Sequence, residues 1–386
     1  MTKPTIGVFF GSRSTEHDIS IVTAISSVIK PLELGKKYNV LPVYIAKDGR
    51  WYASPDLADI KLFSSGKIDN WLAKHKPVQL LFYNGLKLVQ KNSLPSKLFS
   101  IDIAFPATHG THGEDGELMG VFEMAGVPYV GCGPAASAVA MDKVLAKQIA
   151  VASNIPTSKF VAFSKHDFMT DPKPFLAEIK RLKYPLFVKP AHLGSSIGIT
   201  RVTDEKDLQN AIEVALHYDN LALAEEAVPN LVEVTLPIIG NETPEPALLE
   251  QPLTHAEDFF DFDTKYMSGG KKGKGAKESG AQGYSKLPAD LPKKLYDQAV
   301  QTGLNVYKAI GASGIARVDM LVDTKKQVVY FNEVNPLPGS LYAHNWAKAG
   351  MSNVNLVHKL VDLALERAES QKKSELVFKT NYLKQY

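Results

Sequence analysis

The pattern that most constrains this chain is a strand, a glycine-containing turn and a helix, in that order from its start. Residues 5–10 are a run of β-branched and aromatic residues, and the turn Gly11–Thr15 follows. Apolar residues then recur at helical spacing as far as Ile29. Thr15 and Asp18 have the spacing of a helix cap. This unit is typical of an α/β fold.

Two further strand-like runs, 38–45 and 101–106, continue the alternation of strands and helices. Such alternation implies a parallel sheet, whose binding edge lies at the carboxyl ends of the strands. Glu16 follows the first strand and its turn, and His109 lies in the polar segment 107–116 that follows the run ending at residue 106. We therefore expect Glu16 and His109 to lie on that shared edge.

The length of 386 residues indicates two or three packed domains. Residues 137–150 predict a helix, and 184–190 predict a strand that enters the small, polar loop 191–198. A hairpin is expected from 313 to 335, around a turn at its middle. The predicted domains are an N-terminal α/β domain, a small central domain and a C-terminal domain, with the boundaries 1–134, 135–224 and 225–386.

The predicted hairpin carries the most informative chemistry. Side chains alternate along a strand, so Arg317 and Asp319 share one face, as do Glu333 and Asn335. A turn centred on Lys325 would place Arg317 opposite Glu333. One surface would then present the oxygen donors that Mg²⁺ prefers. The alternative is an exposed strand face with a salt bridge.

The loop 191–198 predicts a phosphate site. Lys189 leaves the preceding strand, and backbone amides with the hydroxyls of Ser195 and Ser196 would cradle a polyphosphate. The order of residues is not that of a Walker loop, so a P-loop fold is not indicated. The alternative is a plain glycine-serine turn. Lys143, on the predicted helix, would ordinarily belong to a solvated helix face.

A basic loop, residues 265–277, contains five lysines and four glycines, which favours a mobile segment able to close over a phosphate substrate. Nucleic acid is a poor alternative because the net charge is only +3. The single cysteine, Cys132, excludes an intrachain disulfide and is expected to be a small packed residue. The sequence shows no leader and no long uncharged apolar stretch, so we expect a cytoplasmic protein without a membrane span.

Seven segments, in this order over nearly the whole chain, resemble the D-alanine-D-alanine ligases of the ATP-grasp superfamily. They are 11–20, 109–116, 126–143, 188–198, 260–266, 316–319 and 332–335. The resemblance implies an ATP-grasp fold in which the central and C-terminal domains grip ATP. It also implies small amino-acid substrates and a homodimer.

The resemblance assigns roles residue by residue. For the nucleotide it implies Lys143, Lys189, Ser196, Glu225, Glu226, Val228, Glu233 and Lys265. For catalysis it implies Glu16, Ser195, Tyr266, Arg317 and Gly339. For two Mg²⁺ ions, which Mn²⁺ can replace, it implies Asp319, Glu333 and Asn335. For the amino-acid substrates it implies His109, Asn335 and His344.

The chain departs from the family pattern in two places. The segment 229–233 lacks the usual glycine-arginine pair, and His344 stands where the family places a serine that binds the carboxylate of the second substrate. The leading hypothesis is ATP-dependent formation of D-alanyl-D-alanine for peptidoglycan precursors. A sister ligase with another amino acid or a hydroxy acid as acceptor is the alternative, although Tyr266 argues against lactate. A non-catalytic nucleotide-binding protein is a third reading.

Overall fold

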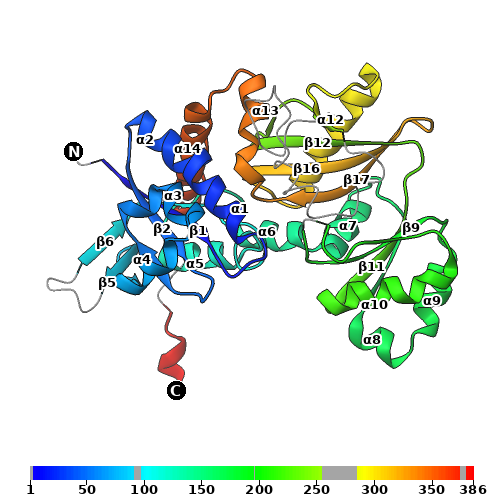
Figure 1. The fold of residues 1–386 in the computed structure, drawn as a ribbon, viewed down its shortest axis with the longest axis horizontal. Helices are drawn as coiled ribbons and strands as arrows, with labels where there is room; N and C mark the ends of the chain where they lie inside the picture. The colour runs from blue at the N-terminus through cyan, green and yellow to red at the C-terminus, as the bar shows by residue number, and fades with distance from the viewer. Residues whose placement is uncertain (1–2, 91–96, 195, 254–284, 374–379) are drawn as a thin grey trace.

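The computed structural model describes residues 3–90, 97–194, 196–253, 285–373 and 380–386. Three four-stranded sheets follow one another along the chain, and Figure 1 shows them with helices packed around each. Two smaller sheets contain β4–β6 and β14–β15. Within the described residues, no helix is both long enough and apolar enough to cross a membrane.

The first sheet has the order β3-β2-β1-β7. Its strands β1, β2 and β7 are parallel, as predicted, whereas β3 runs antiparallel at the edge. The strands of this region are β1 (Thr5–Gly11), β2 (Asn39–Ile45), β3 (Trp51–Ala53), β4 (Gln79–Phe82), β5 (Leu86–Gln90), β6 (Lys97–Ile101) and β7 (Ile103–Pro106). Its helices are α1 (His17–Val22), α2 (Lys30–Gly35), α3 (Ile60–Ser64), α4 (Ile68–Lys74) and α5 (Glu117–Ala125).

Three local predictions for this region were wrong. The strand expected at 101–106 is divided, because Asp102 leaves the ladder and its carboxylate accepts the N–H of Thr5. Thr15 does not cap the first helix: the N-cap of α1 is Glu16, and no side-chain hydrogen bond caps it. The helix also continues past its expected end, through a π-helical segment (Thr23–Ile29) and into α2.

The helix predicted at 137–150 is two helices, α6 (Pro134–Met141) and α7 (Lys143–Ala152). Asp142 lies between them with extended backbone angles. Its carboxylate accepts the N–H groups of Val144 and Leu145, both at 2.9 Å. Aspartate is a favoured N-cap residue, so Asp142 ends one helix and starts the next. Alanines of both helices pack in one hydrophobic cluster with β12, β16 and β17.

The second sheet has the order β10-β9-β11-β8 and is antiparallel at each pairing. Its elements are β8 (Phe160–Ser164), α8 (Lys165–Thr170), α9 (Lys173–Ile179), β9 (Leu186–Pro190), β10 (Thr200–Val202), α10 (Leu208–Tyr218) and β11 (Leu221–Glu226). Figure 1 shows α8, α9 and α10 gathered on the outer side of this sheet.

The third sheet has the order β13-β12-β16-β17 and contains the predicted hairpin. Its strands, with the small sheet beside it, are β12 (Leu231–Gly240), β13 (Glu245–Pro246), β14 (Gln251–Pro252), β15 (Ser285–Lys286), β16 (Gly314–Asp323) and β17 (Val328–Asn335). The helices are α12 (Lys293–Ala309), α13 (Ala343–Lys348) and α14 (Asn353–Gln371). Although it lies far from the first sheet in sequence, α14 packs in the core of that sheet through Leu356, Val357 and Leu360.

Candidate active site

The centre of the site is one face of the hairpin β16–β17. Arg317, Asp319, Glu333 and Asn335 are all partly buried on that face, as strand alternation predicted. We call these four residues the open face. The predicted pairing of Arg317 with Glu333 was wrong: Asp319 lies opposite Glu333, and Arg317 lies opposite Asn335.

The pairing differs for two physical reasons. The turn pairs Asp323 with Val328, which moves the register by one residue from the expected centre. A bulge then follows, because Asp319 pairs with Glu333 while the next residue, Met320, pairs with Phe331. The extra residue shifts the last part of β17 by one more position. The register shift and the bulge together place Asp319 opposite Glu333 on the open face.

The contacts on the open face are charged and well aligned. Arg317 donates from Nε and Nη2 to the two carboxylate oxygens of Asp319, at 2.7 and 2.5 Å. Asn335 donates from Nδ2 to Asp319 at 3.2 Å. Burial lowers the pKa of Arg317, but Asp319, Tyr342 and Glu333 together raise it more, so that pKa lies well above its ordinary value. The two carboxylates and the amide fit the oxygen donor set that Mg²⁺ prefers.

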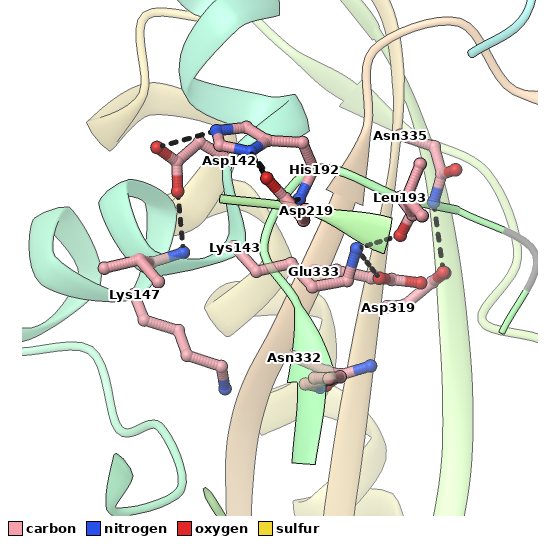
Figure 2. A network of polar contacts seen from close by, with 12 residues as sticks. Asp142, Lys143, Lys147, His192, Leu193, Asp219, Asp319, Asn332, Glu333 and Asn335 are labelled. Atoms are coloured by element: carbon pink, nitrogen blue, oxygen red, sulfur yellow. Dashed lines mark hydrogen bonds and ion pairs between the residues drawn. The ribbon is translucent and has the colours of Figure 1, made fainter. Parts of the chain in front are cut away.

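Lys143, the first residue of α7, joins the open face to the loop after β9 (Figure 2). Its ammonium lies 3.4 Å from Oε2 of Glu333 and donates to the carbonyl of Leu193 at 2.6 Å. The side chain is 8% exposed, so the expectation of a solvated helix face was wrong. One ammonium group therefore touches both the candidate metal face and the predicted phosphate loop.

Next to this face lies a second charged group, Lys147, Glu225 and Lys189, which we call the buried triad. The two ammonium groups lie 2.8 and 2.5 Å from the two oxygens of Glu225. Ser158 also donates to Glu225, at 2.8 Å. Burial raises the pKa of Glu225, but Lys147 and Lys189 lower it more, so that pKa lies well below the ordinary value.

The other residues that the resemblance assigns to the nucleotide lie at the end of β11, in the connection after it and on β12. Glu226, the last residue of β11, accepts the N–H of Lys183 at 3.0 Å, and Val228 follows in the connection to β12. Glu233 on β12 pairs with Leu321 of β16 and lies two residues from Thr235, which pairs with Asp319. Because side chains alternate, Glu233 faces the same side of the sheet as Asp319.

The edge of the first sheet carries Glu16 and His109, as expected. The carboxylate of Glu16 lies against Gly110 and Gly194, where a Cβ on either glycine would meet it at 3.0 and 3.6 Å. His109 is buried, and its Nε2 lies 2.9 Å from Oγ1 of Thr23 in the π-helical segment. Glu16 thus lies where the first sheet meets the loop after β9.

A left-handed turn lies between the open face and that edge. It begins at Gly339, and residues 340–342 have φ angles of 51, 54 and 52°. Non-glycine residues in this region cost about 1–3 kcal/mol each and cluster at functional sites. The N–H of Ser340 donates to Thr23 at 3.0 Å, which ties the turn to the first sheet. Gly339 therefore lies between two parts of the site.

His344 follows this turn and contacts a buried carboxylate. Its Nε2 lies 2.8 Å from Oε2 of Glu250, to which Asn345 donates at 3.0 Å. Burial raises the pKa of Glu250, but the bonds from His344 and Asn345 lower it more. The ring of Tyr342 lies between them and Arg317, at 4.8 Å from His344 and 5.2 Å from the guanidinium. His344 Nδ1 is buried and has no hydrogen-bond partner among the described residues.

Some predicted residues lie outside the described part of the chain: Ser195, Lys265, Tyr266 and the rest of the basic loop 265–277. Ser196 is described, with a φ of 61°. Sequence reasoning gave no role to Lys147 or Glu250. The lysine lies four residues after Lys143, and that helical spacing was the available signal.

Two further features lie outside this site: a cysteine with a predicted role, and a cluster that the sequence analysis did not consider. Cys132 is fully buried, as predicted for a packed residue, and burial raises the pKa of its thiol to about 11. His112, Asp115 and Glu117 have ligand atoms within 4.8 Å of one another. Asp115 accepts N–H groups from His112 and Glu117, so this cluster organises the loop before α5.

Comparison with known proteins decides the family. A family model described as the D-ala D-ala ligase N-terminus matches residues 5–132, and one described as the D-ala D-ala ligase C-terminus matches residues 149–362. The chain belongs to the D-alanine-D-alanine ligase family. A curated D-alanine-D-alanine ligase of Chlorobaculum tepidum is 35% identical over 387 residues, with 95% of this chain and 98% of that protein covered. One of Acetivibrio thermocellus is 34% identical, with 95% and 96% covered.

Two solved structures resemble this member of the ligase family over nearly its whole length. The D-alanine-D-alanine ligase from Coxiella burnetii is 29% identical, has a TM-score of 0.79 and covers 97% of each chain. The VanG D-Ala:D-Ser ligase from Enterococcus faecalis is 29% identical, has a TM-score of 0.78 and covers 94% of this chain and 100% of its own. The three-sheet architecture is therefore the ATP-grasp fold expected from the sequence.

Proposed function

We propose that this protein is an ATP-dependent ligase that joins two molecules of D-alanine for peptidoglycan precursor synthesis in the cytoplasm. The observation that carries this proposal is the position of Lys143, whose ammonium lies at once against Glu333 on the open face and against Leu193 in the predicted phosphate loop. A ligand with both phosphate and metal would use these groups together, because a cation, a phosphate loop and oxygen donors for a metal converge here. The names of the curated relatives supply the substrate.

The residues divide into binding and activating groups. Lys143, Lys189 and the loop 191–198 would hold the nucleotide phosphates, with residues 225–228 and Glu233 at the adenine and ribose. Asp319, Glu333 and Asn335 would hold Mg²⁺ as two ions, for which Mn²⁺ can substitute. The metal would neutralise phosphate charge during phosphoryl transfer.

The proposed chemistry follows from charge. A carboxylate is a poor electrophile, so the first D-alanine must be activated as an acyl phosphate, which the neutral amine of the second then attacks. Arg317 and the N–H of Gly339 would stabilise the oxyanion that forms. Glu16 and His109 would hold the first amino acid, with Ser195 and Tyr266 outside the described residues completing that group.

A second candidate function differs from the first in the acceptor, which is the second substrate of the ligase. His344 stands where the family places a carboxylate-binding serine, and it is held by Glu250. One structural neighbour is a D-Ala:D-Ser ligase. A ligase with another amino acid or hydroxy acid as acceptor therefore remains the alternative, and a homodimer is proposed for either.

One experiment separates the two. Phosphate release from ATP is measured with D-alanine alone and with D-alanine paired with D-serine, D-lactate or L-alanine, and the products are identified by mass spectrometry. We expect turnover with D-alanine alone and D-alanyl-D-alanine as the product. Turnover only in the presence of a different acceptor would replace the leading function with the alternative. Absence of phosphate release with every pair would contradict both.

A further inference from the structure

His192 lies between two aspartates from different elements, just after the end of β9 (Figure 2). Its Nδ1 lies 2.9 Å from Oδ2 of Asp219, and its backbone N–H donates to the same oxygen at 2.8 Å. On the other side, its Nε2 lies 3.4 Å from Oδ2 of Asp142. Each nitrogen of this histidine therefore faces a carboxylate.

This arrangement requires a positive charge on the ring. A neutral imidazole has one N–H group, so it would turn a lone pair toward one of the two carboxylates, whereas an imidazolium donates to both. Hydrogen bonds to Asp142 and Asp219 raise the pKa of His192 to about 10, against the lowering effect of burial. Burial raises the pKa of each aspartate, but the bond from His192 helps to bring both below their ordinary values.

Each aspartate holds the start of an element. Asp142 caps α7 with its other oxygen, through two backbone N–H groups. Asp219 uses its other oxygen to accept the N–H of Leu221, where β11 begins, at 3.3 Å. His192 thus joins the start of α7 to the second sheet.

The residues on both sides of His192 hold Lys143. The backbone N–H of Lys143 donates to the carbonyl of Ala191 at 3.1 Å, and its ammonium donates to the carbonyl of Leu193 at 2.6 Å. The same ammonium lies 3.4 Å from Glu333 on the open face. A shift of the backbone at 191–193 would therefore move the cation that the ligase presents to the phosphates.

We propose that His192 is a positioning residue: held as a cation between Asp142 and Asp219, it fixes residues 191–193 against the start of α7 so that Lys143 is held where it meets the nucleotide phosphates. This proposal rests on the proposed function. The ring does not need to touch a substrate, because it acts through the backbone on either side of it.

The first test compares His192→Gln, His192→Arg and a matched control, His166→Ala. Glutamine cannot carry the charge, so we expect kcat/KM for Mg·ATP to fall about 10- to 100-fold, as for other small misplacements, with a smaller change in the KM for D-alanine. Arginine is always charged and has planar donors for two carboxylates, so it should recover most of the loss. His166 is an exposed histidine on α8, and its variant should match the wild type.

The second test uses a readout that packing alone would not move. Asp219→Asn removes one carboxylate, so the pKa of His192 should fall toward that of an ordinary histidine. The activity of this variant should then decline, relative to the wild type, as the pH rises from 7 to 9. Nitrogen chemical shifts of the His192 ring, assigned by their loss in His192→Gln, should show an imidazolium at pH 8 in the wild type and a neutral ring in Asp219→Asn.

Several outcomes would overturn the proposal. One is a wild-type kcat/KM in His192→Gln, and another is an arginine variant no better than glutamine at equal thermal stability. A neutral His192 ring in the wild type at pH 7 would do the same. If His192→Gln does not fold, the ring signals are assigned by their loss in His192→Arg, and Asp219→Asn and the ring signals of the wild type decide. A wild type that binds Mg·ATP by calorimetry but releases no phosphate with any amino acid pair would contradict the proposed function, while the ring signals still test His192.

Discussion

The open face and the buried triad lie side by side in one site and use charge in different ways. On the open face, the side chains of Arg317, Asp319 and Glu333 are 20, 14 and 31% exposed. In the triad, the side chains of Lys147 and Glu225 are 0 and 4% exposed. Solvent therefore reaches the side chains of the open face, whereas the side chains of Lys147 and Glu225 are closed to it.

This difference in exposure indicates which charged side chains can still bind a ligand. Glu225 accepts from two ammonium groups and a hydroxyl, so most of its hydrogen-bonding capacity is used inside the protein. Buried charges are stable only when paired in this way. Asp319 and Glu333 are held by Arg317 and Lys143 but still reach the surface of the site, where a cation can add to their coordination. We infer that the buried pair of Lys147 and Glu225 maintains the site, while the open face, with Lys143 and Lys189, meets the ligands.

The largest expected effect is on activity, from changes on the open face. Glu333→Gln and Asp319→Asn should each lower ATP-dependent phosphate release by about 10³-fold or more, because charge neutralisation by a metal is worth several kcal/mol in phosphoryl transfer. Thermal unfolding should show that both variants fold. Asp297→Asn, on the exposed surface of α12, is the control and should be fully active. Turnover like that of the wild type in either variant would remove the metal assignment.

Next in size is a loss of stability from the buried triad. Glu225→Gln leaves two buried ammonium groups without a carboxylate, which should cost about 3–5 kcal/mol in the free energy of unfolding. The exposed pair Lys293–Asp297 provides the comparison, since breaking it should cost less than about 1 kcal/mol. Urea unfolding of Glu225→Gln and of Asp297→Asn measures the two losses. Equal losses in the two variants would show that the triad is not a structural group.

The pH dependence of that loss follows from the lowered pKa of Glu225. A carboxylate with a lowered pKa contributes stability above its ordinary pKa and loses it as the pH falls through the folded value. The gap between the wild type and Glu225→Gln should therefore persist from pH 8 down to about pH 5 and close only in strong acid. A gap that closes between pH 8 and 6 would point to a different group.

Sequence patterns predicted the open face better than the triad, for a physical reason. Strand alternation is a local property, and it correctly predicted that Arg317 and Asp319 share one face. The exact pairing depended on a bulge near Met320, which leaves no clear signal in the residues. The triad joins residues from three elements, and its members meet only through the packing of α7 on the third sheet and the pairing of β9 with β11.

In the fold, too, local features could be predicted from the sequence and long-range contacts could not. Parallel pairing of β1, β2 and β7 could be predicted from local alternation, because each strand and turn is continuous in sequence. The left-handed turn after Gly339 could not, since it is held by a contact with the distant Thr23. The break at Asp142 had a local signal, a favoured N-cap residue, which the helical pattern of the apolar residues concealed. The packing of α14 against the first sheet is likewise a long-range result.

A third effect concerns the pair of His344 and Glu250, whose exposure is intermediate between that of the open face and that of the buried triad. The histidine side chain is 23% exposed and the glutamate 4%. If His344 holds the carboxylate of the second amino acid, His344→Ala should raise the KM for that amino acid about 10- to 100-fold, because a hydrogen bond to a charged group is worth about 1.5–3 kcal/mol. The KM values for ATP and for the first amino acid should change little. Steady-state kinetics with both amino acids varied would test this, and an equal change in all three constants would place His344 outside the acceptor site.

The smallest expected effect is on stability at His192, which is paired with carboxylates as the triad lysines are, but whose side chain is 48% exposed. Its raised pKa, about 10, means that it contributes stability that is complete below pH 6.5 and disappears as the pH rises through 10. Solvent screening limits the contribution to about 1 kcal/mol. The deficit of His192→Gln in urea unfolding should therefore be largest near pH 6, smaller at pH 8.5 and close to zero above pH 10. A deficit that grows with pH would mean that the ring is neutral in the folded protein, and a deficit as large as that of Glu225→Gln would mean that exposure does not separate the two kinds of charged group.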